Sequence, residues 1–247
     1  MKTQILLKTA LVIVLGVLLA SCNKNESDLK NQTAVKFVAD YQTTKSTLVK
    51  NIAETNVVIE SFKINVAEIE IEFNSDDPMF ETDSVATDYD LEGPFEIDLV
   101  KDGNAIEATI ANNVELPTAA YEEIEFEFKE SENSISDMYG KSILIEGTIG
   151  GTPFIFWANE EIELEIEFDE TVQLDEANRA MLTVSFDLSK LFDISAGGID
   201  ITGATDGNEN GIIEIYPEDP DGNSDLSDSI WEKIEFITEA FEEKYDD

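Results

Sequence analysis

The chain has 247 residues, with 55 Asp and Glu against 15 Lys and Arg, and a formal net charge of −40. Such an acidic chain repels nucleic acid and anionic lipid surfaces. It contains no histidine and one cysteine, which excludes a Ser-His-Asp triad, a Cys-His pair, an intramolecular disulfide and the usual His/Cys zinc sites. The 14 phenylalanines and 42% hydrophobic content predict one packed core rather than a disordered acidic segment.

The N-terminal region is organised like a bacterial lipoprotein precursor. An unbroken apolar run, ALVIVLGVLLA at residues 10–20, is too short to span a bilayer as a permanent helix. The run ends in LASC at residues 19–22, which resembles a lipobox, the motif in which small residues precede a cysteine that receives a diacylglyceryl group. The sequence therefore predicts a signal peptide over residues 1–21 and lipidation at Cys22, in preference to a buried structural thiol.

The segment after Cys22 indicates how the chain is presented. Residues 22–32 are polar except for Leu29 and predict a flexible tether. A diacylglyceryl group together with an amide-linked chain of the palmitate type is enough for stable anchoring without a spanning helix. We expect a lipid-anchored protein of the outer membrane, exposed at the cell surface, with the periplasmic face as the alternative.

Four segments alternate apolar residues with acidic ones. They are AEIEIEF at 67–73, FEIDL at 95–99, EEIEFEFKE at 122–130 and EIELEIEFDE at 161–170. A period of two residues predicts strands with one buried and one solvated face. The residues expected to face the core in the last two segments are Ile124, Phe126, Phe128, Ile162, Leu164, Ile166 and Phe168.

Shorter apolar runs extend this pattern. We expect further strands at 33–39, 56–64, 105–110, 142–149, 153–158 and 181–188. Turn signals such as Asp102-Gly103-Asn104 and Gly150-Gly151 separate them. This spacing predicts a mainly β protein, an antiparallel β-sandwich over residues 33–200, rather than βαβ units. Trp157 lies in the run PFIFWA and is assigned to the core.

Glutamate is a poor strand former, so its repeated use needs a reason. Charged strand faces increase solubility and resist pairing between exposed edges, which is the interpretation we favour. A pair of catalytic carboxylates is the alternative. A ladder of many equivalent glutamates singles out no such pair.

Residues 201–225 are predicted to form acidic, calcium-type loops. In DGNENGIIEIYPE, at residues 206–218, the oxygen-bearing residues and a glycine follow the spacing of a calcium loop. Position 12 is Pro217, so the missing carboxylate is expected from the next acidic stretch, and the affinity for Ca²⁺ is expected to be weak, about 10⁻⁴ to 10⁻³ M. The predicted ligands are Asp206, Asn208, Asn210, Ile212, Glu214, Glu218, Asp219 and Asp221. A polar turn that leads into a short strand is the alternative.

One amphipathic helix is predicted at the C-terminus, over residues 226–245. Its apolar residues are spaced by four, seven and eleven positions and are Ile230, Ile234, Ile237 and Phe241. Ser227 or Asp228 is expected to cap its start. Its polar face carries glutamates, so the helix is expected to pack on the β-domain or a partner rather than on a membrane.

Three segments resemble a bacterial lipoprotein family known only as domain of unknown function 4382. They are LPTAAYEEIEFEF at 116–128, the EIELEIEFDE segment and LTVSFDLSKLF at 182–192. The resemblance covers residues 33–192 and implies a lipobox, a β-sandwich and an extracytoplasmic location. It departs at the start, where QTTKST at 42–47 replaces the family's acidic turn. No activity follows from it.

The sequence favours a non-enzymatic surface lipoprotein, a binding or structural β-module stabilised by calcium, with a polysaccharide or another surface protein as partner. A carboxylate-dependent glycoside hydrolase or lyase is the alternative, and it requires a cleft with two carboxylates. A subunit of a surface fibre, in which a strand is donated between chains, is a third hypothesis.

Overall fold

The structure is a computed structural model that describes residues 32–40, 57–73, 88–115, 120–173, 180–188 and 190–244. Its strands are β1 (Gln32–Asp40), β2 (Val57–Phe73), β3 (Asp88–Lys101), β4 (Asn104–Ala105), β5 (Glu107–Glu115), β6 (Ala120–Phe128), β7 (Ile143–Ile149), β8 (Thr152–Ala158), β9 (Ile162–Gln173), β10 (Ala180–Asp187), β11 (Ile213–Ile215) and β12 (Thr238–Lys244). A 3₁₀ turn, η4 (Ile194–Ala196), and one helix, α1 (Ser224–Phe236), complete the described elements. The predicted signal peptide with Cys22, the tether up to residue 31 and the QTTKST stretch lie outside the described residues.

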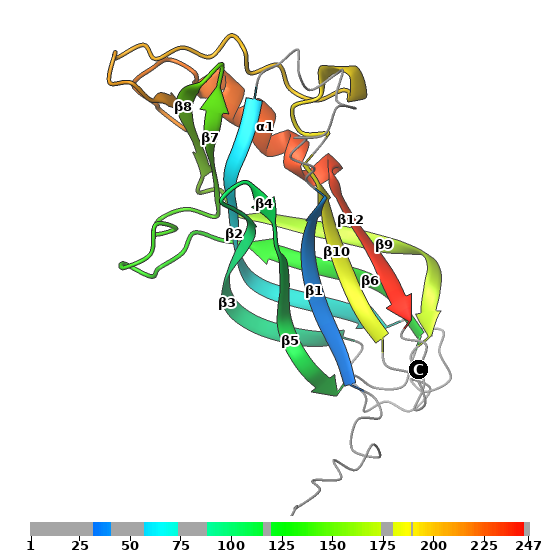
Figure 1. The fold of residues 1–247 in the computed structure, drawn as a ribbon. Helices are drawn as coiled ribbons and strands as arrows, with labels where there is room; N and C mark the ends of the chain where they lie inside the picture. Colours follow the sequence, from blue (N-terminus) through cyan, green and yellow to red (C-terminus); the bar gives the residue numbers. More distant parts are fainter. Residues whose placement is uncertain are drawn as a thin grey trace, which may run out of the picture.

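The strands form two sheets (Figure 1). The smaller sheet has the order β12-β10-β1-β5, and the larger has the order β11-β8-β7-β2-β3-β4, with β6 and β9 branching from β2. This confirms a mainly β sandwich with one C-terminal helix. Strand pairing is antiparallel except for β1 with β10 and β8 with β11, which are parallel. Alternation predicts a strand and its buried face but not the direction of its neighbour, so these parallel pairs were not foreseen.

Strand β2 organises the larger sheet. The segments expected as separate strands at 56–64 and 67–73 form this one strand, which pairs with β3 along one edge. Along its other edge the first half pairs with β7 and the second half with β6. Asn65 lies at this fork and is 1% exposed. Its backbone N–H donates to Ser142 O at 2.8 Å, and its side chain donates to Lys129 O at 2.8 Å, so it binds both branches.

Aromatic pairs connect the two sheets across the core. Phe37 on β1 meets Phe126 on β6 edge-to-face at 5.3 Å between ring centroids. Phe62 on β2 meets Phe186 on β10 in the same way at 5.8 Å. All four rings are 0% exposed, and such pairs add to the stabilisation that burial alone provides.

The buried face predicted for the alternating segments is confirmed where the structure describes it. Ile124, Phe126 and Phe128 are 0% exposed, and Leu164 is 3% exposed. Ile162 and Ile166 are partly buried against the same core. The side chain of Phe168 is outside the described set.

The start of the C-terminal helix differs from its prediction. Helix α1 begins at Ser224, so Ser227 and Asp228 lie inside its first turns, and the prediction that either caps it is wrong. Asn223 precedes the helix, and its carbonyl accepts hydrogen bonds from Leu226 N at 2.9 Å and Ser227 N at 3.4 Å. The Asn223 side chain donates to Thr205 O and Glu214 O, which holds this residue against the neighbouring loop directly before the helix.

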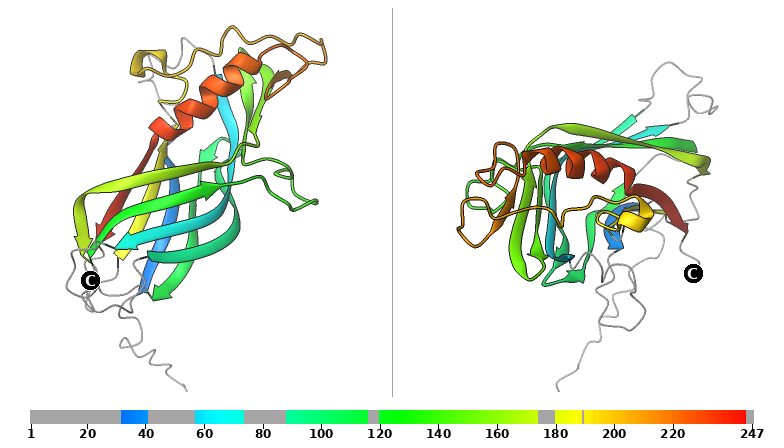
Figure 2. Two further views of the ribbon diagram at one scale, coloured as in Figure 1. Left: turned by 180° about the vertical axis from the view of Figure 1, so that it is seen from behind. Right: turned by 90° about the horizontal axis from the view of Figure 1, so that it is seen from above.

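The helix also ends earlier than predicted. It stops at Phe236, and Thr238–Lys244 forms β12, which pairs with β10. Ile230, Ile234 and Ile237 are each at most 2% exposed, which confirms the apolar stripe of the helix. The apolar residues keep a helical spacing as far as Phe241, but pairing with β10 makes residues 238–244 a strand. Figure 2 shows α1 running from the end of the molecule that carries β8 to the start of β12.

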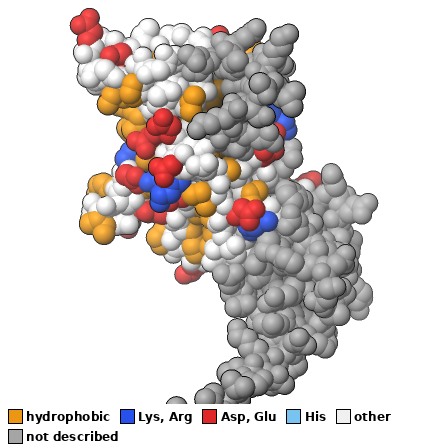
Figure 3. Space-filling view, viewed as in Figure 1, with side chains coloured by type: hydrophobic (Ala, Val, Ile, Leu, Met, Phe, Trp, Pro, Cys, Tyr) orange, Lys and Arg blue, Asp and Glu red, His pale blue; other side chains and the backbone are white. Residues whose placement is uncertain are grey.

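A loop over residues 129–142 projects from the fork between β6 and β7 (Figure 1). Glu96 on β3 accepts hydrogen bonds from Ser136, at 2.8 Å, and from Ser131. Lys63 on β2 forms an ion pair with Asp137 in the loop. Figure 3 shows basic and acidic side chains side by side on the face of the molecule seen in Figure 1. Ile135 in this loop is 94% exposed.

Candidate functional site

Carboxylates form three rows across four strands on the face of the larger sheet that points away from the core. The register aligns the strands in the order β3, β2, β6 and β9. The rows are Asp88, Glu72, Glu123 and Glu167; Asp90, Glu70, Glu125 and Glu165; and Glu92, Glu68, Glu127 and Glu163. Like charges directly opposite one another destabilise a sheet by up to about 1 kcal/mol per pair. We call this set the carboxylate rows.

Glutamates on the two inner strands of the rows bind protons unusually tightly. Glu70 and Glu123 are half-buried, whereas Asp88, Asp90 and Glu165 on the outer strands are exposed. Burial, followed by the charges of Asp90 and Glu125, raises the pKa of Glu70 to about 7. Burial, followed by the charges of Glu165 and two neighbouring glutamates, raises the pKa of Glu123 to about 7. Both side chains therefore titrate near neutrality.

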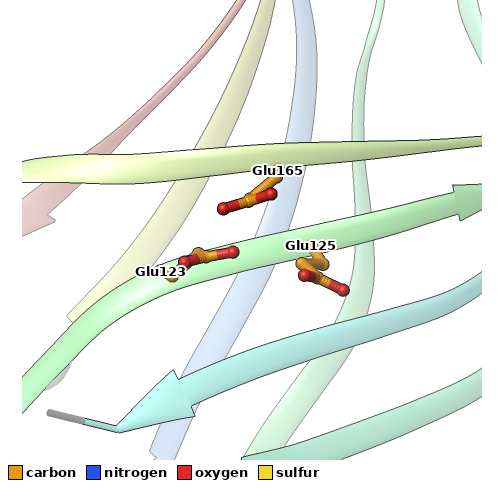
Figure 4. A group of neighbouring side chains, drawn as sticks. All are labelled: Glu123, Glu125 and Glu165. Atoms are coloured by element: carbon orange, nitrogen blue, oxygen red, sulfur yellow. The ribbon is translucent and has the colours of Figure 1, made fainter.

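Three members of the rows come close enough to share a cation. Carboxylate oxygens of Glu123, Glu125 and Glu165 lie within 4.8 Å of one another. Figure 4 shows Glu123 and Glu125 on β6 and Glu165 on the neighbouring β9. The pKa of Glu125 is also raised, first by burial and then by Glu72. The sequence alone does not single out this group, because alternation identifies a charged face but not the register that brings two strands together.

The predicted calcium-type loop folds around the carboxylate of Asp206. Its Oδ1 accepts a hydrogen bond from Asn210 N at 3.0 Å, and its Oδ2 accepts one from Gly211 N at 2.8 Å. Gly211 has a φ of 91°, in the region that favours glycine, as the sharp turn at the sixth loop position requires. Ile212 N donates to Asn210 Oδ1 at 2.8 Å.

The second acidic stretch lies directly against this loop. Asp221 is 9% exposed, and its two carboxylate oxygens accept from Asn208 N at 2.9 Å and Glu214 N at 2.7 Å. Asn223 donates from Nδ2 to Thr205 O at 2.9 Å and to Glu214 O at 2.8 Å. We call the two joined loops, residues 205–223, the clasp. Asn223 was not among the predicted ligands, although it lies two residues after Asp221.

One buried carboxylate oxygen in the clasp has no hydrogen-bond donor among the described residues. Asp219 Oδ1 accepts from Asp221 N at 2.8 Å and Asn223 N at 2.9 Å. Asp219 Oδ2 is buried and has no hydrogen-bond partner. A buried oxygen of an ionised carboxylate requires a donor or a cation to offset its lost hydration.

Glu214, on β11, connects the clasp to the larger sheet. Its Oε2 accepts from Asn208 Nδ2 at 2.7 Å and Asn210 Nδ2 at 2.9 Å, and its Oε1 accepts from Tyr216 OH at 2.7 Å. Burial, followed by this bond, raises the pKa of Tyr216 to about 12. The Tyr216 ring stacks on Trp157 with centroids 4.7 Å apart.

Trp157 was assigned to the core, and this assignment is wrong. Phe154, Phe156 and Ala158 on β8 are buried, and Trp157 alternates with them on the opposite face. Because β8 carries apolar residues on both faces, its sequence does not show which of them alternate between the core and the opposite face. The stack with Tyr216 gives the ring its partial burial.

The structure brings most of the predicted ligands together. Asp206, Asn208, Asn210, Glu214 and Asp221 are linked by direct hydrogen bonds. Asp219 is linked to this group because its carboxylate accepts a hydrogen bond from the backbone N–H of Asp221. Ile212 is linked to it because its backbone N–H donates to the Asn210 side chain. Glu218 is exposed, in a turn with a φ of 58°, and its side chain makes no hydrogen bond to the other predicted ligands among the described residues.

Within the part of the chain that the structure describes, no helix is long and apolar enough to cross a membrane. A comparison with protein-family models gives no match. Comparisons with curated proteins and with solved structures also give no match.

Proposed function

We propose that the chain is a lipid-anchored lipoprotein of the cell envelope that acts as a non-enzymatic binding or structural β-module, with calcium bound in the clasp. The N-terminal motif supports lipidation at Cys22, and the location we propose is the outer membrane, with the protein exposed at the cell surface. The partner we propose is a polysaccharide or another surface protein, and the acidic surface disfavours nucleic acid.

The buried, donor-free oxygen of Asp219 carries the calcium proposal. It belongs to a clasp in which most other oxygens are carboxylate, amide and carbonyl groups, the ligands that Ca²⁺ prefers. Carboxylates that accept one hydrogen bond per oxygen keep a further lone pair for a cation. Asp206 and Asp221 meet this condition, because each of their carboxylate oxygens accepts one hydrogen bond.

The carboxylate rows do not favour an enzyme. Glycoside hydrolysis assigns different roles to two carboxylic acids that flank the scissile bond. The raised pKa values of Glu70 and Glu123 suit an acid, but similar neighbours surround both along equivalent rows. Burial, followed by charge repulsion within the rows, explains these raised pKa values without a catalytic role.

Calcium is expected to raise the melting temperature of the purified protein, and Asp206→Ala is expected to abolish the rise. With a dissociation constant of about 0.1 to 1 mM, about 10 mM calcium adds roughly 1.4 to 2.7 kcal/mol to the free energy of unfolding. The measurement is thermal unfolding at constant ionic strength, with sodium chloride replacing calcium chloride.

Glu209→Gln is the matched control, since Glu209 is an exposed acid in the same loop, and it should respond like the unaltered protein. An equal rise in Asp206→Ala would show that calcium only screens the general charge. A rise that Glu123→Gln abolishes instead would place the cation in the carboxylate rows.

Cys22→Ser is expected to prevent lipidation and release the protein from the membrane fraction, or to leave unprocessed precursor. The measurement is fractionation of expressing cells with detection of acylated protein. Ser21→Ala keeps a small residue before the cysteine and should be processed normally. Membrane retention of a processed Cys22→Ser protein would contradict the lipid anchor. Protease treatment of intact cells tests surface exposure, and full protection of the unaltered protein would place the domain in the periplasm.

A further inference from the structure

Asn210 is followed by Gly211 in the clasp. An asparagine before a glycine is open to attack by the next backbone nitrogen, because glycine has no Cβ to obstruct the approach. In this reaction Gly211 N loses its proton to hydroxide and forms a bond to Asn210 Cγ. The Cγ–Nδ2 bond breaks, Nδ2 leaves as ammonia and a cyclic imide results. Water then opens the imide to aspartate or isoaspartate, so one water is consumed and one ammonia is released.

Three hydrogen bonds restrain the groups that must react. Gly211 N, the nucleophile, donates to Asp206 Oδ2 at 2.8 Å. Asn210 Oδ1 accepts from Ile212 N at 2.8 Å. Asn210 Nδ2, the leaving group, donates to Glu214 Oε2 at 2.9 Å. The carboxylate of Asp206 disfavours a negative charge on the adjacent nitrogen, and the two bonds to the amide group fix Cγ in place.

We propose that Asn210 is a deamidation site that the closed clasp suppresses and that opening of the clasp exposes. Conversion to aspartate adds a carboxylate at the fifth position of the loop, where calcium loops commonly use acidic ligands. Conversion to isoaspartate adds a backbone carbon between residue 210 and Gly211 and disrupts the hydrogen bond to Asp206. Each product records irreversibly that the clasp has opened.

This inference rests on hydrogen bonds within the chain and not on a bound cation. It therefore stands or falls separately from calcium binding. Opening of a local segment precedes reaction of a protected group, so the rate in the folded protein reports the population of the open clasp.

The test compares deamidation of the full chain in buffer and in concentrated urea at pH 8, by mass spectrometry of the peptide that contains residue 210. The unaltered protein is expected to react at least about tenfold more slowly when folded than in urea. Asp206→Ala is expected to react in buffer at nearly the urea rate, and both proteins should react equally in urea. The peptide with Asn133, which lies in the projecting loop, serves as an internal reference in every sample.

Equal rates for the unaltered protein in buffer and urea would overturn the proposal, as would an Asp206→Ala protein that stays as slow as the unaltered one. Circular dichroism on the same samples shows whether the variant is folded. If it is not, Glu214→Ala provides the second variant, because it removes the acceptor of the leaving nitrogen. A folded Glu214→Ala protein with an unchanged rate would also contradict the proposal.

Discussion

Phe126→Ala is expected to lower the free energy of unfolding by about 3 to 5 kcal/mol, because it removes a large side chain from a fully packed site. Phe126 is 0% exposed and contacts Phe37 of the opposite sheet edge-to-face at 5.3 Å. In a domain of this size such a loss lowers the melting temperature by roughly 6 to 20 °C. Urea denaturation of the purified protein measures it.

Ile135→Ala is the matched control for this substitution. Ile135 is 94% exposed, so its truncation should change stability by less than about 0.5 kcal/mol. Phe126→Leu retains part of the buried volume and should lose less than Phe126→Ala. Equal stability of the Phe126→Ala and Ile135→Ala proteins would contradict the sandwich core described above.

The protein is expected to become more stable as the pH falls from 8 towards 5. In the folded state the pKa of Glu70 and Glu123 is about 7, above the ordinary value of about 4.3 that applies to the unfolded chain. Between these values the folded protein binds more protons than the unfolded chain, so the free energy of unfolding falls as the pH rises through this window. Urea denaturation at pH 5, 6, 7 and 8 and fixed ionic strength measures the slope.

Replacing both glutamates should remove much of this slope. Glu70→Gln together with Glu123→Gln is expected to stabilise the protein at pH 8, by on the order of 1 kcal/mol for each like-charged pair removed, and to have little effect at pH 5. Glu127→Gln is the control within the same rows, because Glu127 pairs with Lys129, and its loss should give no stabilisation. Stability that rises steadily from pH 5 to 8 would contradict the repulsion within the rows.

The sequence predicted those features that depend on neighbouring residues along the chain. Alternation of apolar and acidic residues predicts the strands and their buried face, because successive side chains of a strand point to opposite sides. Ile124, Phe126 and Phe128 are buried as expected. The spacing of Asp206, Asn208 and Asn210 in the first loop likewise follows from local backbone geometry.

Features that need a partner far away in the sequence required the tertiary structure. The carboxylate rows depend on the register of four strands, and a one-residue slip would move each strand's glutamates to the other face. Strand β12 also depends on a distant partner, because its residues have helical spacing but pair with β10. The position of Trp157 likewise depends on Tyr216, about sixty residues later, on which it stacks. Local pattern determines which side chains a strand offers to each face, whereas contact between distant segments determines which of them meet.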